Sequence, residues 1–389
     1  MGTERLYYTD CYLADFDAEV VRTEKDGAVV YLDRTAFYPA SGGQPHDLGL
    51  CGGMPVTGVI DQDEEIAHVL GAPISAGRVQ CSIDWPRRYD HMQQHTGQHL
   101  LSAAFAAQCG FRTVSFHLGP GLSTIDLETA ELSDRQVEQV ENRAAQLVRD
   151  ARPVRVGFEE ATLANALRKP SSRTGVLRII EIEGLDRSAC GGTHVRSTAE
   201  LGPILIRRRE KLRGNVRVEF VCGDRALARA RKDFHLLGET ARLCAGAIDD
   251  LPRRVDSLRE RLAEAEKQRQ KLAADLAEAE GRRLWESTKP GLDGIRRRVL
   301  DVDSIRESTR ALAQSFISAG QAALLVRGRD PFTLLFAASP DSNLHAGNLL
   351  RNSLQKYGGR GGGSAAIAQG TLPNTAYARD VSRDLGFEE

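Results

Sequence analysis

Apolar and polar residues alternate over short runs through the first 88 residues of the chain. Two runs rich in β-branched residues flank Lys25-Asp26-Gly27, which is typical of a turn between two strands. Further strand patterns follow in "TGVIDQDEEIAHVL" and "GRVQCSIDW". Because these strands are short and no helical period interrupts them, the pattern predicts a small β-barrel or rolled sheet over residues 1–88.

A helical period replaces the alternation from Asp90 onwards. Asp90 is the expected N-cap, with Gln93 three residues later as in a capping box, and the helix should end at Gly110. A second helix is expected from Ser133 to just before Pro153, and strand patterns lie between and after the two. Residues 89–223 therefore read as an α+β domain.

Residues 224–289 have a long helical pattern. Apolar positions step by alternating threes and fours, with one arginine in the series: Leu251, Val255, Leu258, Leu262, Ala265, Arg269, Leu272, Leu276 and Ala279. Such a heptad seam predicts a helical hairpin or a coiled coil. Beyond Pro290-Gly291, helical and strand patterns alternate and predict a small α/β domain over residues 290–389. The fold class as a whole is predicted to be α+β.

Composition narrows the class of protein. The 389 residues carry 52 Lys and Arg against 53 Asp and Glu, so any surface for nucleic acid must be a local basic patch. No apolar run reaches the length of a membrane span, and the first residues lack a signal-peptide pattern, which predicts a soluble, cytoplasmic protein without a membrane partner. The odd number of cysteines, 7, argues against a disulfide framework and leaves the thiols free for cores or metal binding.

The stretch "YDHMQQHTGQHLLSAAF" places three histidines four residues apart, at 91, 95 and 99. His95 and His99 lie well inside the expected helix, where an i, i+4 pair projects from one face and can chelate a metal. By itself such a pair is also typical of a solvated helix face. His91 would follow the cap in the first turn, and we interpret it as a neighbour rather than a ligand.

A second pair lies in "CGGTHV", where Cys190 and His194 are separated by two glycines and a threonine. The glycines favour a tight loop that brings thiolate and imidazole together. Three imidazoles and one thiolate match a ligand preference of zinc, so one Zn²⁺ per chain is predicted at His95, His99, Cys190 and His194.

These motifs, with "FYPASGGQPHDLG" upstream of them, resemble the editing domain of alanyl-tRNA synthetases and their free-standing relatives, the AlaX proteins. The long helices and "GGRGGGSAAIAQG" resemble the C-terminal part of the synthetase, so the likeness points to a long-form AlaX protein. It implies a zinc-dependent hydrolase that deacylates tRNA(Ala) mischarged with serine, and with glycine as a second substrate. Because the chain starts at the editing module, no aminoacylation is expected.

The resemblance also implies roles for single residues. The four predicted ligands correspond to the family's zinc site, and Gln44 to a residue at the aminoacyl-ester end of the substrate. Thr35 would hydrogen-bond the hydroxyl of serine. Without the family, the surroundings of Gln44 are typical of an ordinary hairpin turn.

Two features of the chemistry stay open at this level. Four protein ligands would favour a structural or substrate-positioning zinc, whereas three with an open position would favour direct activation of water. Cys190 is interpreted as a ligand thiolate, since no base partner for a nucleophile is evident. A zinc-containing tRNA-binding accessory protein without catalysis, and a zinc hydrolase on another aminoacyl ester, are the alternatives.

Contacts with tRNA are expected at two places. The stretch "RRREKLRG" forms a basic cluster beside the zinc loop, although an exposed hairpin of mixed charge explains it equally well. A glycine-rich loop near the C-terminus could approach phosphates, and Ser364 stands there where the family commonly has a basic residue. A homodimer through the coiled coil or the C-terminal domain is the other expected partnership. The predicted tRNA-binding residues are Arg207, Arg208, Arg209, Lys211, Arg213, Lys356 and Arg360.

Overall fold

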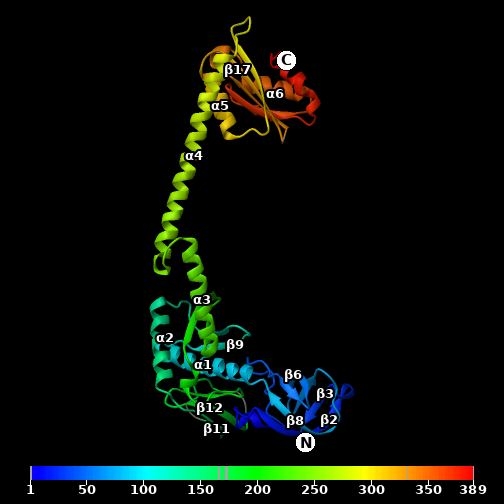
Figure 1. The fold of residues 1–389 in the computed structure, drawn as a ribbon, viewed down its shortest axis with the longest axis vertical. Coiled ribbons are helices and arrows are strands. Elements are labelled where there is room, and N and C mark those ends of the chain that lie inside the picture. The colour runs from blue at the N-terminus through cyan, green and yellow to red at the C-terminus, as the bar shows by residue number, and fades with distance from the viewer. Residues whose placement is uncertain (1, 165–166, 171–173, 331, 389) are drawn as a thin grey trace. The chain divides into compact units, whose positions relative to one another are not determined.

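The structure is a computed structural model that describes residues 2–164, 167–170, 174–330 and 332–388. Contacts divide the chain into two compact units, residues 1–239 and residues 240–389, and each is described by itself (Figure 1). Both units combine helices with sheets, so the predicted α+β class is confirmed.

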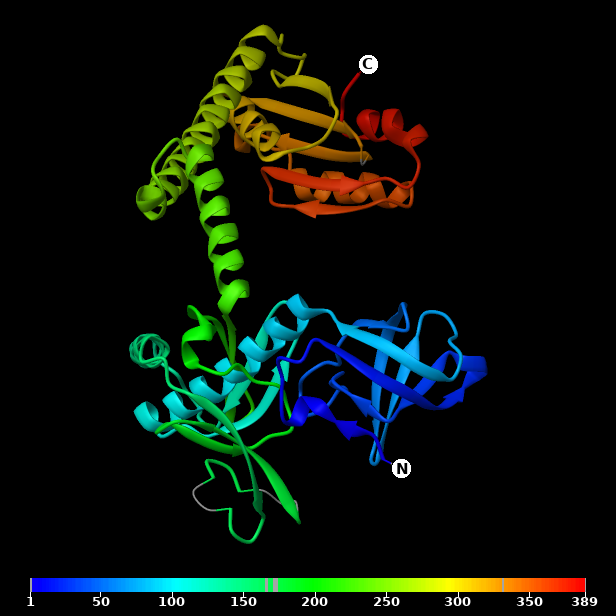
Figure 2. The ribbon, with the colours of Figure 1, turned by 60° about the horizontal axis from the view of Figure 1, so that its bottom comes forward.

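Six strands of the first unit close into a barrel in the order β2-β3-β7-β6-β5-β8, which is seen from the side in Figure 2. Buried apolar side chains fill its interior, among them Val30, Phe37 and Ile66. A short parallel pair, β1 with β4, lies outside the barrel order. The bounds are β1 Glu4–Arg5, β2 Asp15–Glu24, β3 Val29–Leu32, β4 Arg34–Thr35, β5 Gly49–Cys51, β6 Met54–Gln62, β7 Glu65–Leu70 and β8 Gly77–Ile83.

Two further sheets and two helices complete the part of this unit that carries the predicted ligands. One sheet has the order β14-β15-β10-β9 and the other β11-β12-β13, and all their neighbouring strands are antiparallel. Helix α3 follows directly on β15. The bounds are α1 Trp85–Cys109, β9 Thr113–Leu118, β10 Ser123–Leu127, α2 Asp134–Arg149, β11 Val154–Glu160, β12 Val176–Ile182, β13 Asp186–Ala189, β14 Ile204–Leu212, β15 Asn215–Cys222 and α3 Gly223–Leu243.

The start of α1 corrects the sequence prediction. The helix begins at Trp85, and its N-cap is Asp84, whose side chain accepts a hydrogen bond from the backbone N–H of Arg87. Pro86 fits the first turn because its missing N–H would have no partner there. The predicted cap, Asp90, therefore lies inside the helix. The predicted end is confirmed, since Gly110 caps the helix with a φ of 71°.

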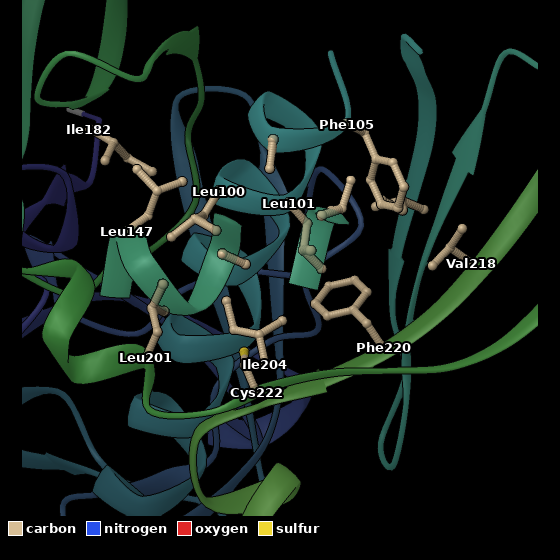
Figure 3. Packing of buried hydrophobic residues seen from close by; sticks show 14 of the residues in the cluster. Leu100, Leu101, Phe105, Leu147, Ile182, Leu201, Ile204, Val218, Phe220 and Cys222 are labelled. Carbon is tan, nitrogen blue, oxygen red and sulfur yellow. The ribbon is translucent and has the colours of Figure 1, made fainter. Parts of the chain in front are cut away.

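Helix α1 runs through the core of this part. Its residues from His91 to Phe105 are buried without interruption, so the helix is covered on every side. Figure 3 shows Leu100, Leu101 and Phe105 packed among side chains from α2 and from the sheets. The packing explains why the sequence shows no clear amphipathic face here: all sides of the helix are interior.

The second unit is built on one sheet in the order β16-β17-β18-β20-β19. Strands β17 and β18 are buried on both faces, with α6 against one and α5 together with the end of α4 against the other. Burial on both faces explains the continuous apolar runs of these strands. The bounds are α4 Leu251–Ser287, β16 Arg296–Val302, α5 Glu307–Ser318, β17 Ala322–Arg329, β18 Phe332–Ala338, α6 Ala346–Lys356, β19 Arg360–Gly363, β20 Ile367–Thr371 and α7 Ala378–Asp384.

Helix α4 carries the predicted heptad seam as one continuous helix (Figure 1). Most of the large apolar residues of the seam are exposed, for example Leu262 at 62% and Leu272 at 68%. Because these residues are exposed, the predicted coiled coil would need a second helix from another chain, and it stays a prediction. Of the helices that the structure describes, none combines the length and the apolar character needed to cross a membrane.

Candidate metal centre

Four side chains from two distant segments meet at one point of the first unit. His95 and His99 project from α1, and Cys190 and His194 come from the loop after β13. One ligand atom from each of the four lies within 4.8 Å of all the others. The sulfur of Cys190 lies 3.4 Å from Nε2 of His95 and 3.4 Å from Nε2 of His194.

These distances fit a tetrahedral ion. Zinc–nitrogen bonds of about 2.0–2.1 Å and zinc–sulfur bonds of about 2.3 Å place neighbouring ligand atoms about 3.5 Å apart. The donor set, three imidazoles and a thiolate, is one that zinc prefers over magnesium or calcium, which take oxygen ligands. The structure thus brings together all four predicted ligands in an arrangement that could hold one metal ion.

Each histidine of the cluster has a partner at its other ring nitrogen. Nδ1 of His95 lies 2.9 Å from Oε1 of Gln44, and Nδ1 of His99 lies 2.8 Å from a carboxylate oxygen of Asp186. Nδ1 of His194 lies 3.1 Å from Oγ1 of Thr96. An acceptor at Nδ1 keeps the proton there and leaves Nε2 free as the ligand atom, which is the usual second layer of a histidine metal site.

Two glycines let the segments approach one another. A Cβ on Gly192 would lie 2.1 Å from Cε1 and 2.3 Å from Nδ1 of His95, so only glycine fits where the loop crosses this ring. A Cβ on Gly97 would lie 2.7 Å from the sulfur of Cys222, where α1 packs on β15. The motifs "CGGTH" and "HTGQH" therefore carry glycine for close packing.

Electrostatics at the cluster favour a thiolate at Cys190 and a neutral imidazole at His194. Burial opposes ionisation of Cys190, but the adjacent His95 and His194 hold the pKa of the thiol well below its usual range. Burial, reinforced by His95, lowers the pKa of His194 to about 3. A thiolate and a neutral imidazole are the forms in which these groups bind metals.

His99, one of the four residues of the cluster, forms a buried pair with Asp186. Burial would lower the pKa of His99, but hydrogen bonds to Asp186 and Cys190 outweigh it and raise the pKa to about 9. Burial likewise opposes ionisation of Asp186, yet His99 and Arg168 lower its pKa to about 2. The carboxylate of Asp186 is therefore a charged anchor, held also by Nε of Arg168 at 2.6 Å.

A cavity of about 680 Å³ opens beside the ligand cluster. Its lining includes His95, His99 and Cys190, the loop residues Ser41 and Gly42, and the aromatic ring of Phe116. Phe116 stacks on His95, with ring centroids 5.2 Å apart. The volume lies within the range of small-molecule sites, so three of the four predicted ligands line a space large enough for a substrate.

The structure gives the remaining predicted site residues different places. Gln44 is buried between His95 and Thr193, with its Nε2 donating to Oγ1 of Thr193 at 2.8 Å. Thr35 lies in the barrel, where its Oγ1 is 2.8 Å from Nε2 of His68, and it is not among the residues that line the described cavity. His91, expected in the first helical turn, lies instead in the second turn of α1 and is 2% exposed.

Most of the predicted tRNA-binding cations have carboxylate partners. Arg207 pairs with Asp233 and Arg209 with Asp134, while Lys211 lies 3.0 Å from Glu131 and Lys356 lies 3.0 Å from Asp384. Three of the set are exposed and have no ion pair within the described part of the chain: Arg208, Arg213 and Arg360.

Sequence reasoning missed the residues behind the ligands. Asp186 and Thr96 each hold a ligand histidine, and Arg178 donates from Nη1 to the carbonyl oxygens of Cys190 and Gly192 at 2.8 and 2.9 Å. Thr96 is adjacent to His95 in sequence, and Asp186 lies four residues before Cys190, so closeness to the predicted ligands is the signal that marks both residues. Nothing in the sequence pattern marks Arg178, because β12 reads as an ordinary apolar strand.

Comparisons with known proteins point in one direction. A family described as "Threonyl and Alanyl tRNA synthetase second additional domain" matches residues 177–219. The chain is 31% identical to "Alanyl-tRNA editing protein AlaX-L" of Pyrococcus horikoshii, over 95% of this chain and 94% of that protein. It is 34% identical to "Alanyl-tRNA editing protein Aarsd1-B" of Xenopus laevis over 69% and 70% of the two chains. An "Alanine--tRNA ligase" of Pyrococcus abyssi is 29% identical over 98% of this chain but only 43% of the ligase.

Proposed function

The chain belongs to the family of alanyl-tRNA editing proteins, and we propose that it hydrolyses the ester bond of tRNA(Ala) wrongly charged with serine, with glycine as a second substrate. One observation carries the proposal beyond family membership: three histidines and one cysteine meet at one point, and three of these four residues, His95, His99 and Cys190, line a cavity of about 680 Å³. The reaction adds the oxygen of water to the acyl carbon, and the ribose oxygen leaves with a proton.

A second hydrolytic site answers a physical limit on selection. A synthetase pocket that accepts alanine cannot exclude the smaller glycine. It also rejects an added hydroxyl poorly, because one such group changes binding by only about 1–3 kcal/mol. Hydrolysis of the wrong ester after charging multiplies this discrimination.

We assign one Zn²⁺ to His95, His99, Cys190 and His194, all of which offer a ligand atom to one point. When bound, zinc supplies Lewis-acid chemistry where a position is open and a rigid hold on its ligands where it is not. Because all four ligand atoms lie close to one another, a closed site that holds its ligands rigidly is the better supported of the two. In that arrangement His95 and His99 of α1 and Cys190 and His194 of the loop after β13 would hold the ion together, and the loop would be fixed against α1 at the cavity that receives the ester.

The surrounding side chains keep this arrangement in place. Gln44, Asp186 and Thr96 orient the three imidazoles, and Arg178 ties the carbonyl groups of the metal loop to β12. We therefore assign Gln44 as a positioning residue that orients the imidazole of His95. The contact of Gln44 with the aminoacyl ester and that of Thr35 with the hydroxyl of serine stay predictions.

The direct experiment measures deacylation of Ser-, Gly- and Ala-tRNA(Ala) by the purified chain. We expect rapid release of serine, slower release of glycine and little release of alanine. His95→Ala should lose the activity and the metal together, whereas His235→Ala, at an exposed position of α3, should keep both. Inactivity of the unchanged protein on all three substrates would leave the non-catalytic accessory role. Equal hydrolysis of free serine esters would indicate a general esterase.

We also propose a homodimer through α4. The exposed heptad residues Leu258, Leu262, Leu272 and Leu276 support it, because apolar residues at this spacing are buried in coiled coils. A Leu262→Asp, Leu272→Asp variant should sediment as a monomer where the unchanged chain sediments as a dimer. A monomeric unchanged chain would contradict the proposal.

A further inference from the structure

One face of the sheet β11-β12-β13 is buried at one end and exposed at the other. Val154 lies opposite Ile182 in the register, and both pack into the hydrophobic core. Phe158 lies opposite Arg178, and Glu160 lies opposite Val176. Since directly opposed and alternate residues point to the same side, these side chains continue the same face beyond the core.

The continued face carries exposed apolar side chains. Phe158 is 50% exposed and Val176 is 61% exposed, and both line the cavity beside the metal cluster. Val114 of β9 also lines the cavity and is 37% exposed. An exposed aromatic ring beside other apolar groups in a concave wall is typical of a binding surface.

The ring of Phe158 lies close to the predicted reaction centre. The residue opposite Phe158, Arg178, donates hydrogen bonds to the carbonyl oxygens of Cys190 and Gly192 in the loop after β13. Opposed Cβ atoms in an antiparallel pair are about 4.5–5.5 Å apart. Arg178 therefore neighbours Phe158 through the strand register and contacts the loop that supplies Cys190 and His194 through its guanidinium.

The lining of the cavity carries more cations than carboxylates, four arginines and lysines against Asp61 and Asp63, and this excess favours a nucleic acid. Lys169 lines the cavity, is exposed, and has no ion pair among the residues that the structure describes. The preceding residue, Arg168, forms an ion pair with Asp186. An aromatic ring and an unpaired cation in the lining of one cavity are the combination that holds unpaired nucleotides, with the base stacked on the ring and the phosphate at the cation.

We propose that Phe158 and Val176 form a stacking platform for an unpaired base of the tRNA 3′ end, namely the base of the nucleotide next to the one that carries the ester. Lys169 contacts the phosphate between these two nucleotides. The inference rests on the proposed function, and it adds a site that reads the RNA chain beyond the terminal nucleoside. Stacking on this platform would raise kcat/KM for esters on a polynucleotide above that for esters on a single nucleoside.

The test compares two serine esters, one on adenosine and one on the trinucleotide CCA, together with full-length Ser-tRNA(Ala). The unchanged protein should have a higher kcat/KM for the trinucleotide ester than for the adenosine ester. In Phe158→Ala this ratio should fall at least about tenfold, the range expected for the loss of one base stack, through a higher KM. Phe158→Trp should restore it, and Lys169→Gln should weaken the salt dependence of KM for the trinucleotide ester.

Phe234→Ala is the matched control, because Phe234 is 66% exposed on α3 and does not line the cavity. An equal fall in kcat/KM for both esters in Phe158→Ala would overturn the proposal, since the ring would then serve the terminal nucleoside. So would an unchanged ratio, or a change of oligomeric state with no change in KM, which would make the patch a protein contact. Failure of the proposed function is distinct: the unchanged protein would then hydrolyse neither ester.

Discussion

The side-chain oxygen of Gln44 lies 2.9 Å from Nδ1 of His95, and it joins the barrel to the metal cluster of the neighbouring helix. The same oxygen accepts the backbone N–H of Thr193 at 3.2 Å, and the amide nitrogen donates to the hydroxyl of that residue. One buried amide thus sets the ring of a ligand on α1 and the position of the loop that holds the other two ligands.

We expect Gln44→Ala to lower zinc affinity and deacylation together, each by about 10- to 100-fold, the usual cost of losing a group that orients a metal ligand. Chelator competition and a deacylation assay measure the two effects. Gln80→Ala, at an exposed position of β8, is the control and should change neither. A rise in KM with unchanged zinc affinity would instead support a direct contact of Gln44 with the substrate.

The two glycines of the metal loop should respond differently to the same change. A Cβ on Gly192 would overlap the ring of His95, with atoms at 2.1 and 2.3 Å, whereas a Cβ on Gly191 would meet only Tyr8, at 3.8 Å. We expect Gly192→Ala to lose most of its zinc and activity and about 1–3 kcal/mol of stability through overpacking. Gly191→Ala should retain bound zinc, measured by elemental analysis. Equal zinc content in the two variants would contradict the role of Gly192.

The sequence was sufficient to predict that these four side chains meet at one point, because metal binding restricts residue type and spacing together. The helical pair of imidazoles alone is also typical of a solvated face, but its combination with a thiolate and an imidazole in a glycine loop has few other uses. The residues behind the ligands were missed for the opposite reason. Asp186, Thr96 and Arg178 act through single hydrogen bonds, which many residue types can make, and their pairing depends on a register that the local pattern does not encode.

Element boundaries show the same limit. The helix end at Gly110 was predicted because a left-handed cap favours glycine, and the start of α2 after Ser133 because the capping box is local. The start of α1 was wrong, since Asp84 and Asp90 are both acceptable caps in sequence. Tertiary packing selects the earlier one, where Arg88 is fully buried and pairs with the equally buried Asp47.

Burial of His68 in the barrel predicts a loss of stability in acid. Burial lowers the pKa of His68 to about 4, while its Nε2 lies 2.8 Å from Oγ1 of Thr35 and its Nδ1 lies 3.3 Å from the carbonyl oxygen of Val30. In the unfolded chain histidine has a pKa of about 6.5, so between these values the unfolded state binds the extra proton. The free energy of unfolding therefore falls as the pH drops from about 6.5 to about 4, by on the order of 3 kcal/mol.

His68→Gln should flatten this part of the pH dependence, although it lowers stability at pH 7. Urea unfolding at several pH values, compared between the variant and the unchanged chain, measures the difference and cancels the contribution of other groups. His117→Gln, at an exposed position of β9, should follow the unchanged chain. Parallel curves for His68→Gln and the unchanged chain would show that His68 does not resist protonation in the fold.

The hairpin of β14 and β15 allows a test within one cluster of cations. Arg208 and Arg213 are exposed and have no ion pair among the described residues, whereas Arg209 pairs with Asp134. If the hairpin contacts phosphates, Arg208→Gln should weaken tRNA binding and lower the slope of log Kd against log salt by about 1. Arg209→Gln should have a smaller effect, because releasing Arg209 for phosphate already costs its ion pair. Titrations of uncharged tRNA(Ala) at several salt concentrations give both slopes. Unchanged slopes in both variants would leave the hairpin as a surface of mixed charge, and the contacts with tRNA would then have to lie elsewhere.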